Sequence, residues 1–494
     1  MQYLLNAKEM KQADTNTIEH FRVPSLVLME RAALKVVEVI EEERLNTGHT
    51  LIVCGCGNNG GDGLAVARML RQKGAEVTVC LLGDYEKCSP QTKQQYDILI
   101  AYGVEIQKEI PEREYTLVID AIFGIGLSRD VEGNYREAIL KMNEISADKL
   151  AVDIPSGIHS DSGRIMGCCF FAEHTVTFAY NKLGLNLYPG AEAAGKITVA
   201  EIGITEESFL GKEPQTIAFT EEDLTGLPKR QAESNKGTYG KVLVIAGNEQ
   251  MAGAAYFSAK AAYLCGCGLV KVVTHENNKT MLHTKLPEAL IQTYEGKKAE
   301  KESLIEAVNW ADVIVVGPGL GQSPLSENIL KTVLKTASVP MVLDADALNL
   351  LAKERELLKL PHTDLIVTPH LGEMARLADM PVDYIKKNLI LTAEEFAREY
   401  NVICVLKDAR TIISIPYGKT YVNLSGNHGM ATGGSGDVLT GMIAGLLAGG
   451  VSPETAAALG VYLHGKAGDT AAGKAGHYSL MASDILDGIS EVTK

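Results

Sequence analysis

The sequence carries less positive than negative charge. Lysine and arginine number 47 against 62 aspartate and glutamate residues, which leaves a net charge of −15 at pH 7. This balance provides neither the basic stripe that binds nucleic acid nor the polybasic anchor that binds a membrane. We therefore expect neither partner, and any phosphate ligand has to be held by local backbone N–H groups and a few cations.

Long apolar runs are absent as well. No window contains 18 uninterrupted apolar residues, so we expect no transmembrane helix. The opening MQYLLNAKEMKQ lacks the pattern of a signal peptide, and nine cysteines without secretory context indicate a reducing, cytoplasmic compartment. Cys54-Gly-Cys56 and Cys265-Gly-Cys267 have no second cysteine pair or nearby histidine pair, which favours small buried residues over metal ligands.

The length of 494 residues predicts two or three domains, since ~100–200 residues form one. A junction at 205–236 contains Pro214 and Pro228 and lacks periodicity, which predicts domains at 1–212 and 220–494. Both halves alternate strands, turns and helices, and this predicts an α/β protein with two doubly wound, three-layer domains. The predicted strands are 51–54, 77–82, 117–120, 150–157, 174–179, 197–202, 241–247, 269–274, 313–316, 340–346, 364–370 and 402–406. The predicted helices are two within 6–45, with Ser25 as a cap of the second, and 64–73, 251–264 and 438–448.

A glycine-rich segment, Gly55 to Gly63, joins the first predicted strand to a helix. It satisfies the G-x-G-x-x-G pattern of dinucleotide binding, and Asp84 ends the next strand about where a ribose-binding carboxylate lies. Asp62, however, opens the helix where a pyrophosphate would sit and would repel it. A dehydrogenase is therefore less favoured than a site for a modified nucleotide or a metal.

Two further strands of the first half end in aspartate, at Asp120 and Asp153. Open α/β sheets bind ligands at the carboxyl ends of their strands, so both could meet Asn59 and Ser156 in one crevice. Such oxygen ligands suit a hard cation, whereas the alternative is that each aspartate caps its own loop.

In the second half, a glycine turn at 432–436 leads into Asp437 and an apolar helix. Glycine N–H groups and a helix N-terminus together form an anion cradle, which suits phosphate. Asp437 could accept the proton of a hydroxyl that attacks the phosphate, while the alternative is a helix N-cap. We expect its pKa to be low, because a helix N-terminus favours negative charge.

Other polar residues of the second half have two interpretations each. Lys407 and Arg410 could neutralise nucleotide phosphates or lie in a solvated turn. His370 could contact a ligand or be satisfied locally. Asp344 and Asp346 could face a hydrated Mg2+ ion or cap the helix that contains Asn349, and the cap is favoured for Asp346.

Taken together, these motifs resemble a known family. NNGGDG at 58–63, the Asp120 loop and the segment 153–157 are similar to the NAD(P)H-hydrate epimerase domain. The segments MAGAA at 251–255, GPGLG at 317–321, TPHLGE at 368–373 and GGSGDVLTG at 433–441 resemble ADP-dependent NAD(P)H-hydrate dehydratase. The resemblance implies a Rossmann-like domain followed by a ribokinase-like domain. It also implies a bifunctional enzyme that epimerises hydrated NAD(P)H and dehydrates the S form, with ADP or ATP as phosphoryl donor.

The resemblance further implies roles for individual residues. Asp153 would be the acid/base of epimerisation and Asp437 the base of dehydration, a K+ ion would be held by Asn59, Asp120 and Ser156, and Mg2+ would accompany the nucleotide. The implied substrate contacts are Asn58, Asn59, Gly60, Gly61, Asp62, Gly124, Ile125, Gly126, Leu127, Ser128, Arg129, Asp130, Tyr135, Asp153, Ala254, Gly319, Gly321, His370 and Asp437. The implied nucleotide contacts are Lys407, Asp408, Ala409, Arg410, Thr411 and Gly436, where Asp408 replaces the glycine usual in relatives. We also expect a homo-oligomer.

Two rival functions are compatible with parts of the sequence. The second half alone fits a ribokinase-like kinase of a vitamin alcohol or sugar, which would leave a stable phosphorylated product. The first half could instead be a nucleotide-sensing module without an activity of its own.

Overall fold

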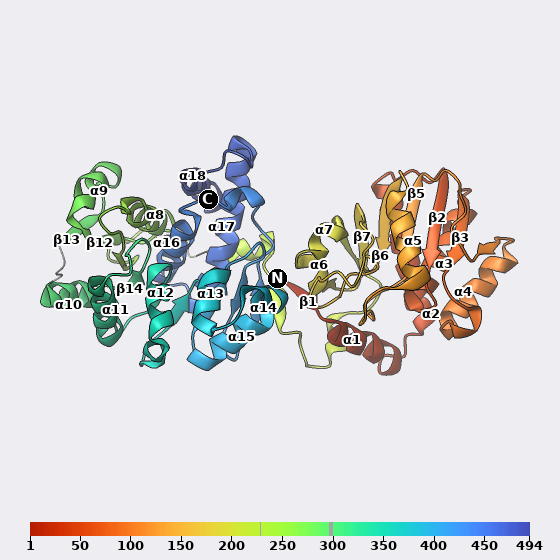
Figure 1. The fold of residues 1–494 in the computed structure, drawn as a ribbon, viewed down its shortest axis with the longest axis horizontal. Helices are drawn as coiled ribbons and strands as arrows, with labels where there is room; N and C mark the ends of the chain where they lie inside the picture. The colour runs from red at the N-terminus through yellow and green to blue at the C-terminus, as the bar shows by residue number, and fades with distance from the viewer. Residues whose placement is uncertain (228, 296–299) are drawn as a thin grey trace. The chain divides into compact units, whose positions relative to one another are not determined.

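A computed structural model describes residues 1–227, 229–295 and 300–494, so Pro228 of the predicted junction lies outside the described residues. The chain folds into two compact units. The first unit is Gln2–Thr216, drawn from red to yellow in Figure 1, and the second is Ile217–Lys494 together with Met1. The division falls inside the junction at 205–236.

The first unit contains a seven-stranded sheet in the order β4-β3-β2-β5-β6-β7-β9, in which every pairing is parallel. Its strands are β2 (His49–Cys54), β3 (Glu76–Leu81), β4 (Ile106–Gln107), β5 (Leu117–Ala121), β6 (Asp148–Val152), β7 (His174–Phe178) and β9 (Lys196–Ala200). Outside this seven-stranded sheet, β1 (Gln2–Leu5) pairs in parallel with β8 (Asn181–Lys182). The helices are α1 (Ala7–Glu19), α2 (Ser25–Glu42), α3 (Asn58–Gln72), α4 (Pro90–Ala101), α5 (Gly133–Glu144), α6 (Leu183–Asn186) and α7 (Gly190–Ala194).

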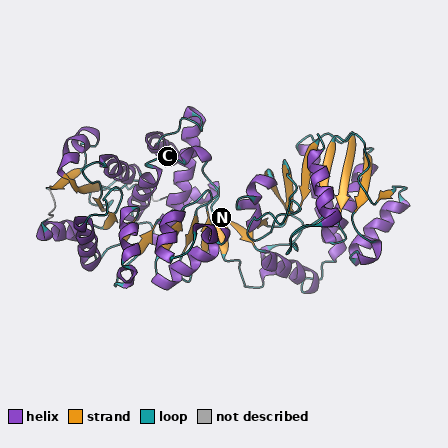
Figure 2. Cartoon of the chain, viewed as in Figure 1, coloured by secondary structure: helices purple, strands orange, loops and turns teal. Residues whose placement is uncertain are grey.

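Both faces of this sheet are covered by helices, as Figure 2 shows in purple and orange. Along β2, Ile52 and Cys54 belong to the buried cluster that contains α2 and α3 residues, whereas Leu51 and Val53 belong to the cluster that contains α5 residues. Neighbouring residues of a strand point to opposite faces, so an uninterrupted apolar run is what a sheet buried on both sides requires. The predicted α/β layers of the first half are confirmed.

The structure corrects two predictions for helix starts. Helix α2 has Pro24 as its N-cap, and Ser25 is already helical. Helix α3 begins at Asn58 rather than at Leu64, so NNGGDG forms its first turns. The glycines there allow close packing, because a Cβ on Gly60 would clash with the Gly55 carbonyl.

The second unit has the strand order β13-β12-β11-β14-β15-β16-β17-β18-β19, parallel up to β17 and antiparallel beyond it. Its strands are β11 (Lys241–Ile245), β12 (Leu269–His275), β13 (Leu290–Tyr294), β14 (Val313–Val316), β15 (Met341–Leu343), β16 (Leu365–Val367), β17 (Ile403–Leu406), β18 (Ile412–Ser414) and β19 (Thr420–Val422), and β10 (Thr216–Ala218) spans the boundary. Its helices are α8 (Ala252–Leu264), α9 (Lys279–Lys285), α10 (Lys301–Trp310), α11 (Pro324–Thr336), α12 (Asp346–Lys353), α13 (Leu371–Ala378), α14 (Val382–Lys387), α15 (Leu389–Tyr400), α16 (Ser435–Ala448), α17 (Pro453–Ala475) and α18 (Ala482–Val492).

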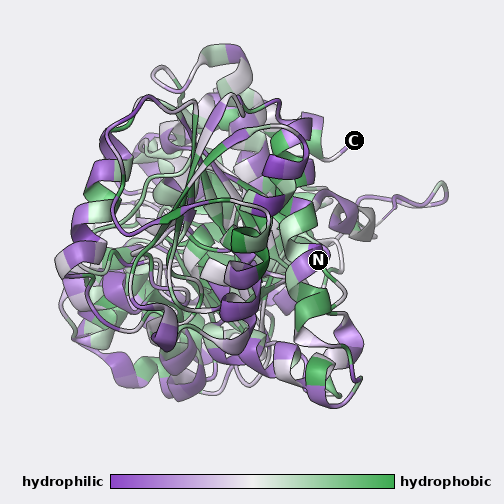
Figure 3. Cartoon of the chain, turned by 90° about the vertical axis from the view of Figure 1, so that its right-hand side faces the viewer, coloured by the Kyte–Doolittle hydropathy of each residue, from purple (hydrophilic) through white to green (hydrophobic). Residues whose placement is uncertain are grey.

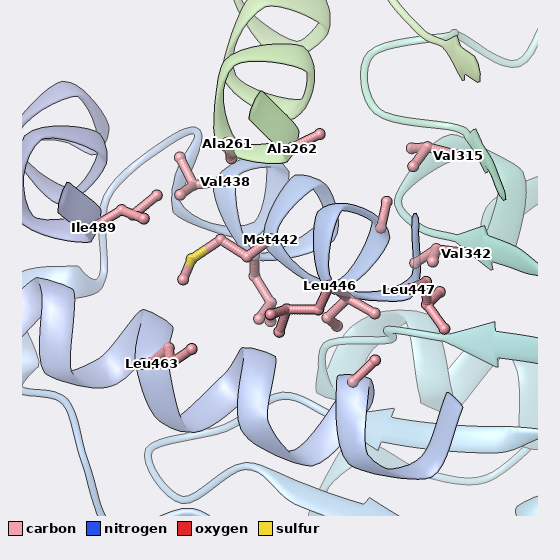
Figure 4. Close-up of a cluster of buried hydrophobic side chains, with 14 of the residues drawn as sticks. Ala261, Ala262, Val315, Val342, Val438, Met442, Leu446, Leu447, Leu463 and Ile489 are labelled. Atoms are coloured by element: carbon pink, nitrogen blue, oxygen red, sulfur yellow. The ribbon is translucent and has the colours of Figure 1, made fainter. Parts of the chain in front are cut away.

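Helix α16 lies at the centre of the second unit's core. Figure 4 shows its residues Val438, Met442 and Leu446 among side chains from α8, α17, α18 and the sheet. Small residues let α8 approach closely, because a Cβ on Gly441 would collide with backbone atoms of α8. A Cβ on Gly445 would lie 2.8 Å from the Cβ of Cys265. A helix that is apolar on all sides is stable only when it is buried in this way.

The hydropathy of the chain follows the layers. In Figure 3 the strands are mostly green, and purple residues gather on the outer sides of many helices. No helix within the described ranges combines the length and the apolar character needed to cross a membrane.

We predict that residues 1–212 and 220–494 fold independently, because each unit has its own series of parallel strands and its own buried apolar clusters. Each fragment, expressed alone, should be soluble and unfold cooperatively in calorimetry, with the full chain measured in the same buffer as the control. Fragments that are insoluble alone and recover only when co-expressed would contradict the prediction.

Candidate functional site

The carboxyl ends of β2, β5 and β6 border a cavity of about 590 Å³ in the first unit. Asp153, Asn58, Asn59, Asp62 and Tyr135, which the resemblance implies as substrate contacts, all line it. The loop residues Gly124, Ile125, Gly126, Leu127 and Ser128 line it as well, whereas Arg129 and Asp130 are exposed and lie outside the lining. Gly60 and Gly61 are buried in the packing of α3 and are not part of the lining.

Asp120 and Ser156 form a buried pair at the edge of the sheet. The Ser156 hydroxyl donates to Asp120 Oδ1 at 2.6 Å, and the Ser156 backbone N–H donates to Asp120 Oδ2 at 2.6 Å. Burial raises the pKa of Asp120 to about 6, although hydrogen bonds from Ser156 and the Ile122 N–H oppose the rise. The predicted convergence of these two residues is thus seen in the structure.

Asn59 carries a buried side-chain amide at the same edge. Neither its Oδ1 nor its Nδ2 has a hydrogen-bond partner among the described residues. A Cβ placed on Gly124 would lie 3.5 Å from Asn59 Cγ and 3.2 Å from Asp153 Oδ2, so all three residues meet at one point of the cavity. Buried polar atoms normally have a hydrogen-bond partner or a ligand, and this amide therefore marks a place for one.

Asp153 is held by groups from the neighbouring strands. Its backbone has a φ of 68°, a left-handed conformation that is uncommon outside glycine. The ammonium of Lys182, which is 1% exposed, donates to Asp153 Oδ1 at 2.7 Å. Burial raises the pKa of Asp62, and the charges of Asp153 and Asp14 raise it further. Lys182 and Asp14 both line the cavity and were not predicted from the sequence.

An apolar wall of this cavity was not predicted from the sequence either. It comes from the first two helices and consists of Met10, Ile18, Leu28, Met29 and Ala32. Their helical spacing indicated only a buried face, and no local pattern in the sequence separates core residues from residues that line a cavity.

In the second unit, the glycine turn ends at the N-terminus of α16. The N-cap is Gly434, with a φ of 91°, and the helix begins at Ser435. Asp437 therefore lies in the first turn, and the interpretation of Asp437 as N-cap is wrong. The backbone N–H groups of the first turn remain directed at the site, as an anion cradle requires.

The expected low pKa of Asp437 is also wrong. Burial raises its pKa to about 7, and the nearby charge of Asp344 adds to the rise, while Lys407 lowers it. The effect of the helix N-terminus is thus smaller than the loss of solvation combined with a second carboxylate.

Partly buried Lys407 forms an ion pair with the buried Asp344. Lys407 Nζ donates to Asp344 Oδ1 at 2.8 Å, and Thr440 Oγ1 of α16 donates to Asp344 Oδ2 at 2.7 Å. Burial lowers the pKa of Lys407, but the charges of Asp344 and Glu373 outweigh it, so the pKa is raised. A Cβ on Gly436 would lie 3.3 Å from Lys407 Nζ, which places the lysine directly at the glycine turn.

His370 is satisfied locally. It is the N-cap of α13, where its Nδ1 accepts from the N–H groups of Gly372 and Glu373, and its side chain is 56% exposed. Burial raises the pKa of Glu373 to about 7, although the Lys407 charge lowers it. A ligand could still reach the exposed face of the His370 ring.

Asp346 does not cap its own helix. Helix α12 has Ala345 as its N-cap, and Asp346 Oδ2 accepts from the Gly321 N–H at 2.8 Å. Asp346 therefore fixes the 317–321 turn, in which Gly319 packs against Ala254. The described ranges contain no group of three or more His, Cys, Asp or Glu residues able to hold a metal ion.

The remaining predicted nucleotide contacts follow β17. The Arg410 guanidinium donates to the Leu424 carbonyl at 3.1 Å, so this side chain is anchored to the protein. Ala409 is exposed, and Asp408 and Thr411 are partly exposed.

Each half of the chain matches the model of a known protein family. Residues 25–184 match the family model of the YjeF-related protein N-terminus, and residues 242–491 match that of NAD(P)H-hydrate dehydratase. A bifunctional NAD(P)H-hydrate repair enzyme of Moorella thermoacetica is 40% identical, over 98% of this chain and 95% of the relative. The enzyme of the same description from Escherichia coli is 32% identical, over 98% and 93%.

Solved structures resemble the second unit. A ribokinase-like superfamily protein from Enterococcus faecalis is 31% identical with a TM-score of 0.52, over 56% of this chain and 95% of that one. An ADP/ATP-dependent NAD(P)H-hydrate dehydratase from Bacillus subtilis, co-crystallised with ATP and Mg2+, is 34% identical with a TM-score of 0.50, over 56% and 96%. These matches confirm the ribokinase-like fold expected for the second half. With both family models matched in order and full-length relatives at up to 40% identity, the chain belongs to the family of bifunctional NAD(P)H-hydrate repair enzymes.

Proposed function

We propose that the chain is a bifunctional enzyme that repairs hydrated NAD(P)H. The first unit interconverts the R and S hydrates, and the second unit dehydrates the S form at the expense of ADP, giving AMP and phosphate. The observation that carries the proposal is the presence of two separate sites in one chain of this family. One is the cavity around Asn59 and Asp153, and the other is the glycine turn around Asp437 and Lys407.

Epimerisation is assigned to the cavity of the first unit. As the hydrated ring carbon changes configuration, its hydroxyl gives up a proton and becomes a carbonyl while the bond from that carbon to the ring nitrogen breaks and leaves its electron pair on the nitrogen. Reclosure on the other face of the carbonyl reforms this bond and returns the proton to the oxygen. Asp153 is the group we propose for this proton transfer, because its Oδ2 is near the Gly124 loop and it lines the cavity. Asn58, Asn59 and Asp62 would bind the nucleotide together with residues 124–130 and Tyr135. The apolar helix wall would exclude water from the ring.

We propose a K+ ion at the polar side of this cavity. The buried amide of Asn59, which has no partner within the described residues, offers an oxygen. Asp120 and Ser156 would add a carboxylate and a hydroxyl, and they accept from the backbone N–H groups of Ile122 and Phe123, two residues of the cavity lining. Oxygen ligands of this kind suit a hard cation. A bound K+ would supply positive charge that holds the polar part of the substrate, and Asn59, Asp120 and Ser156 are the ligands we propose.

Dehydration is assigned to the glycine turn of the second unit. Asp437 would accept the proton of the hydrate's hydroxyl as that oxygen takes a phosphoryl group from ADP, which leaves as AMP. The ring then loses phosphate and a carbon-bound proton and recovers its double bond. The N–H groups at the start of α16 and the Lys407 ammonium would stabilise the phosphoryl charge, and Gly436 leaves room for it.

The nucleotide would be bound by residues 407–411 and Gly436. The Bacillus subtilis relative was co-crystallised with ATP and Mg2+, and we propose that Mg2+ reaches this chain bound to the nucleotide phosphates. Asp344 and Asp346 are already acceptors for Lys407, Thr440 and Gly321, so they are not proposed as its ligands. Ala254, Gly319, Gly321 and His370 would contact the S-hydrate.

The cellular compartment and the oligomeric state of the chain are also proposals. All nine cysteines are free thiols, which supports a reducing, cytoplasmic compartment. The homo-oligomer stays a prediction that light scattering would test. The rival function as a vitamin or sugar kinase is not favoured, since the second half matches the dehydratase family over 242–491.

Replacing Asp437 with asparagine should lower the dehydration rate by ~10²–10⁴-fold, the usual contribution of a general base. Asparagine has the same shape but accepts no proton, and epimerisation in the first unit should be unchanged. The assay follows the release of free phosphate and the recovery of NADH absorbance from S-hydrate with ADP. Dehydration within a few-fold of wild type would refute the role of Asp437.

The pKa of about 7 for Asp437 predicts a pH dependence. A base has to be ionised, so kcat/KM for dehydration should rise with pH and level off above about 7. The pKa of Glu373 is also raised to about 7, so Glu373→Gln is the matched control. This variant should keep the rise of kcat/KM with pH. Loss of the rise in this variant would mean that Glu373, and not Asp437, is the group that titrates.

The same pKa has a consequence for stability. A carboxyl whose pKa is higher in the folded than in the unfolded state loses stability as pH rises between the two values. Asp437→Asn removes this loss, so its gain in melting temperature should be larger near pH 8 than near pH 5. An equal gain at both pH values would contradict the raised pKa.

Asn59→Ala should abolish the K+-dependent part of epimerisation and leave dehydration of S-hydrate intact. Within the described part of the chain the Asn59 side chain has no hydrogen-bond partner to lose, so the variant should fold normally. Interconversion of R and S hydrates, measured by chromatography with and without K+, checks this. A variant that epimerises like wild type in both buffers would show that Asn59 holds no ion.

A further inference from the structure

Lys182 is a buried cation in the epimerase cavity that the proposed mechanism has not used. It is the last residue of β8, is 1% exposed, and still contributes to the cavity lining. Its ammonium donates to Asp153 Oδ1 at 2.7 Å, to Thr177 Oγ1 at 2.8 Å and to the Phe178 carbonyl at 2.7 Å. These three acceptors use all three protons of the ammonium, so its position and orientation are fixed.

The contacts of Asp153 divide its two oxygens. Oδ1 accepts from Lys182, from the Thr177 hydroxyl at 3.2 Å and from the Phe178 N–H at 3.4 Å. Oδ2 is the oxygen that lies near the Gly124 loop, 3.2 Å from where a Cβ on that glycine would be. The lysine side of the carboxylate is therefore saturated, and the other side faces the position of the substrate.

Lys182 is the charged donor in the set that holds Asp153. Its ammonium is 2.7 Å from Asp153 Oδ1, whereas Thr177 and Phe178 of β7 add only neutral donors at 3.2 Å and 3.4 Å. Asp62 of α3 and Asp14 of α1 line the same cavity, and the charge of Asp153 contributes to the raised pKa of each. Lys182 therefore supplies the positive charge beside Asp153 in a cavity that holds three carboxyl groups.

We propose that Lys182 is a positioning residue for epimerisation, which holds the Asp153 side chain with Oδ2 directed at the hydrated ring. The proposal rests on the proposed function of the first unit and adds a residue to it. In the mechanism, Lys182 transfers no proton and makes no bond to the substrate. It fixes which oxygen of Asp153 exchanges the hydroxyl proton and keeps that oxygen free to accept it.

The test compares two variants of the full chain with wild type. Lys182→Met removes the charge and all donors, whereas Lys182→Gln removes the charge but keeps an N–H donor. Lys196→Met is the matched control, because Lys196 pairs with Glu43 at the surface of the same unit and is 60% exposed. For each chain, kcat and KM for the interconversion of R and S hydrates are measured as a function of pH, and melting curves confirm folding.

Both Lys182 variants should lose on the order of 10²-fold in kcat, the effect of a misplaced catalytic group, with little change in KM. The acid limb of kcat/KM should move to higher pH in both, because the carboxyl at position 153 then lacks the cation that lies 2.7 Å from its Oδ1. A structural role alone would lower the active fraction without moving this limb. Lys182→Arg, which restores the charge, should return the limb towards its wild-type position, and Lys196→Met should match wild type throughout.

The proposal would be overturned if both Lys182 variants epimerised with wild-type kcat and with the acid limb of kcat/KM at its wild-type pH. In that case epimerisation by the wild-type chain would still support the proposed function of the first unit. A wild-type chain that does not epimerise would instead refute the proposed function itself. If the variants do not fold, the proposal is tested on the wild-type chain by NMR of the 15N-labelled ammonium of Lys182. Held by three acceptors, it should give a slowly exchanging resonance that shifts when NADPH is bound, and its absence would count against the proposal.

Discussion

Each unit buries a lysine–aspartate pair at the carboxyl edge of its parallel sheet. Lys182 meets Asp153 at 2.7 Å in the first unit, and Lys407 meets Asp344 at 2.8 Å in the second. An unpaired charge at such a place costs several kcal/mol or more, so each pair requires both of its strands in place. The two pairs have different roles in their sites. Asp153 itself faces the cavity, whereas Asp344 is buried and its charge helps to raise the pKa of Asp437 to about 7.

Much of this organisation is visible in the sequence. Apolar runs that end in Asp120 and Asp153 predicted buried parallel strands. The rule that such strands share one carboxyl edge placed Asp153 with Asn59 in one cavity, and Asp120 with Ser156 beside it. The glycines before Asp437 predicted an anion-binding helix start for the same reason, since backbone geometry alone creates it. The motif resemblance then supplied roles that no spacing could give.

The errors and omissions concern properties that depend on the assembled fold. The glycines at 58–63 were interpreted as a turn, although they serve close packing of a helix that starts at Asn58. The pKa of Asp437 was expected to be low, because its burial and the nearness of Asp344 are not local features. Lys182 was missed, since a lone lysine after a strand normally marks a solvated end.

Repair of both hydrates by one chain can be measured as an end point. A mixture of R and S hydrates of NADH is incubated with the full chain, ADP, Mg2+ and K+, and the recovery of NADH absorbance is followed until it stops. The whole mixture should be recovered with one phosphate released per NADH, because epimerisation feeds the R form into dehydration. Recovery that stops at the share of the S form, or a phosphorylated nucleotide that accumulates, would contradict this expectation.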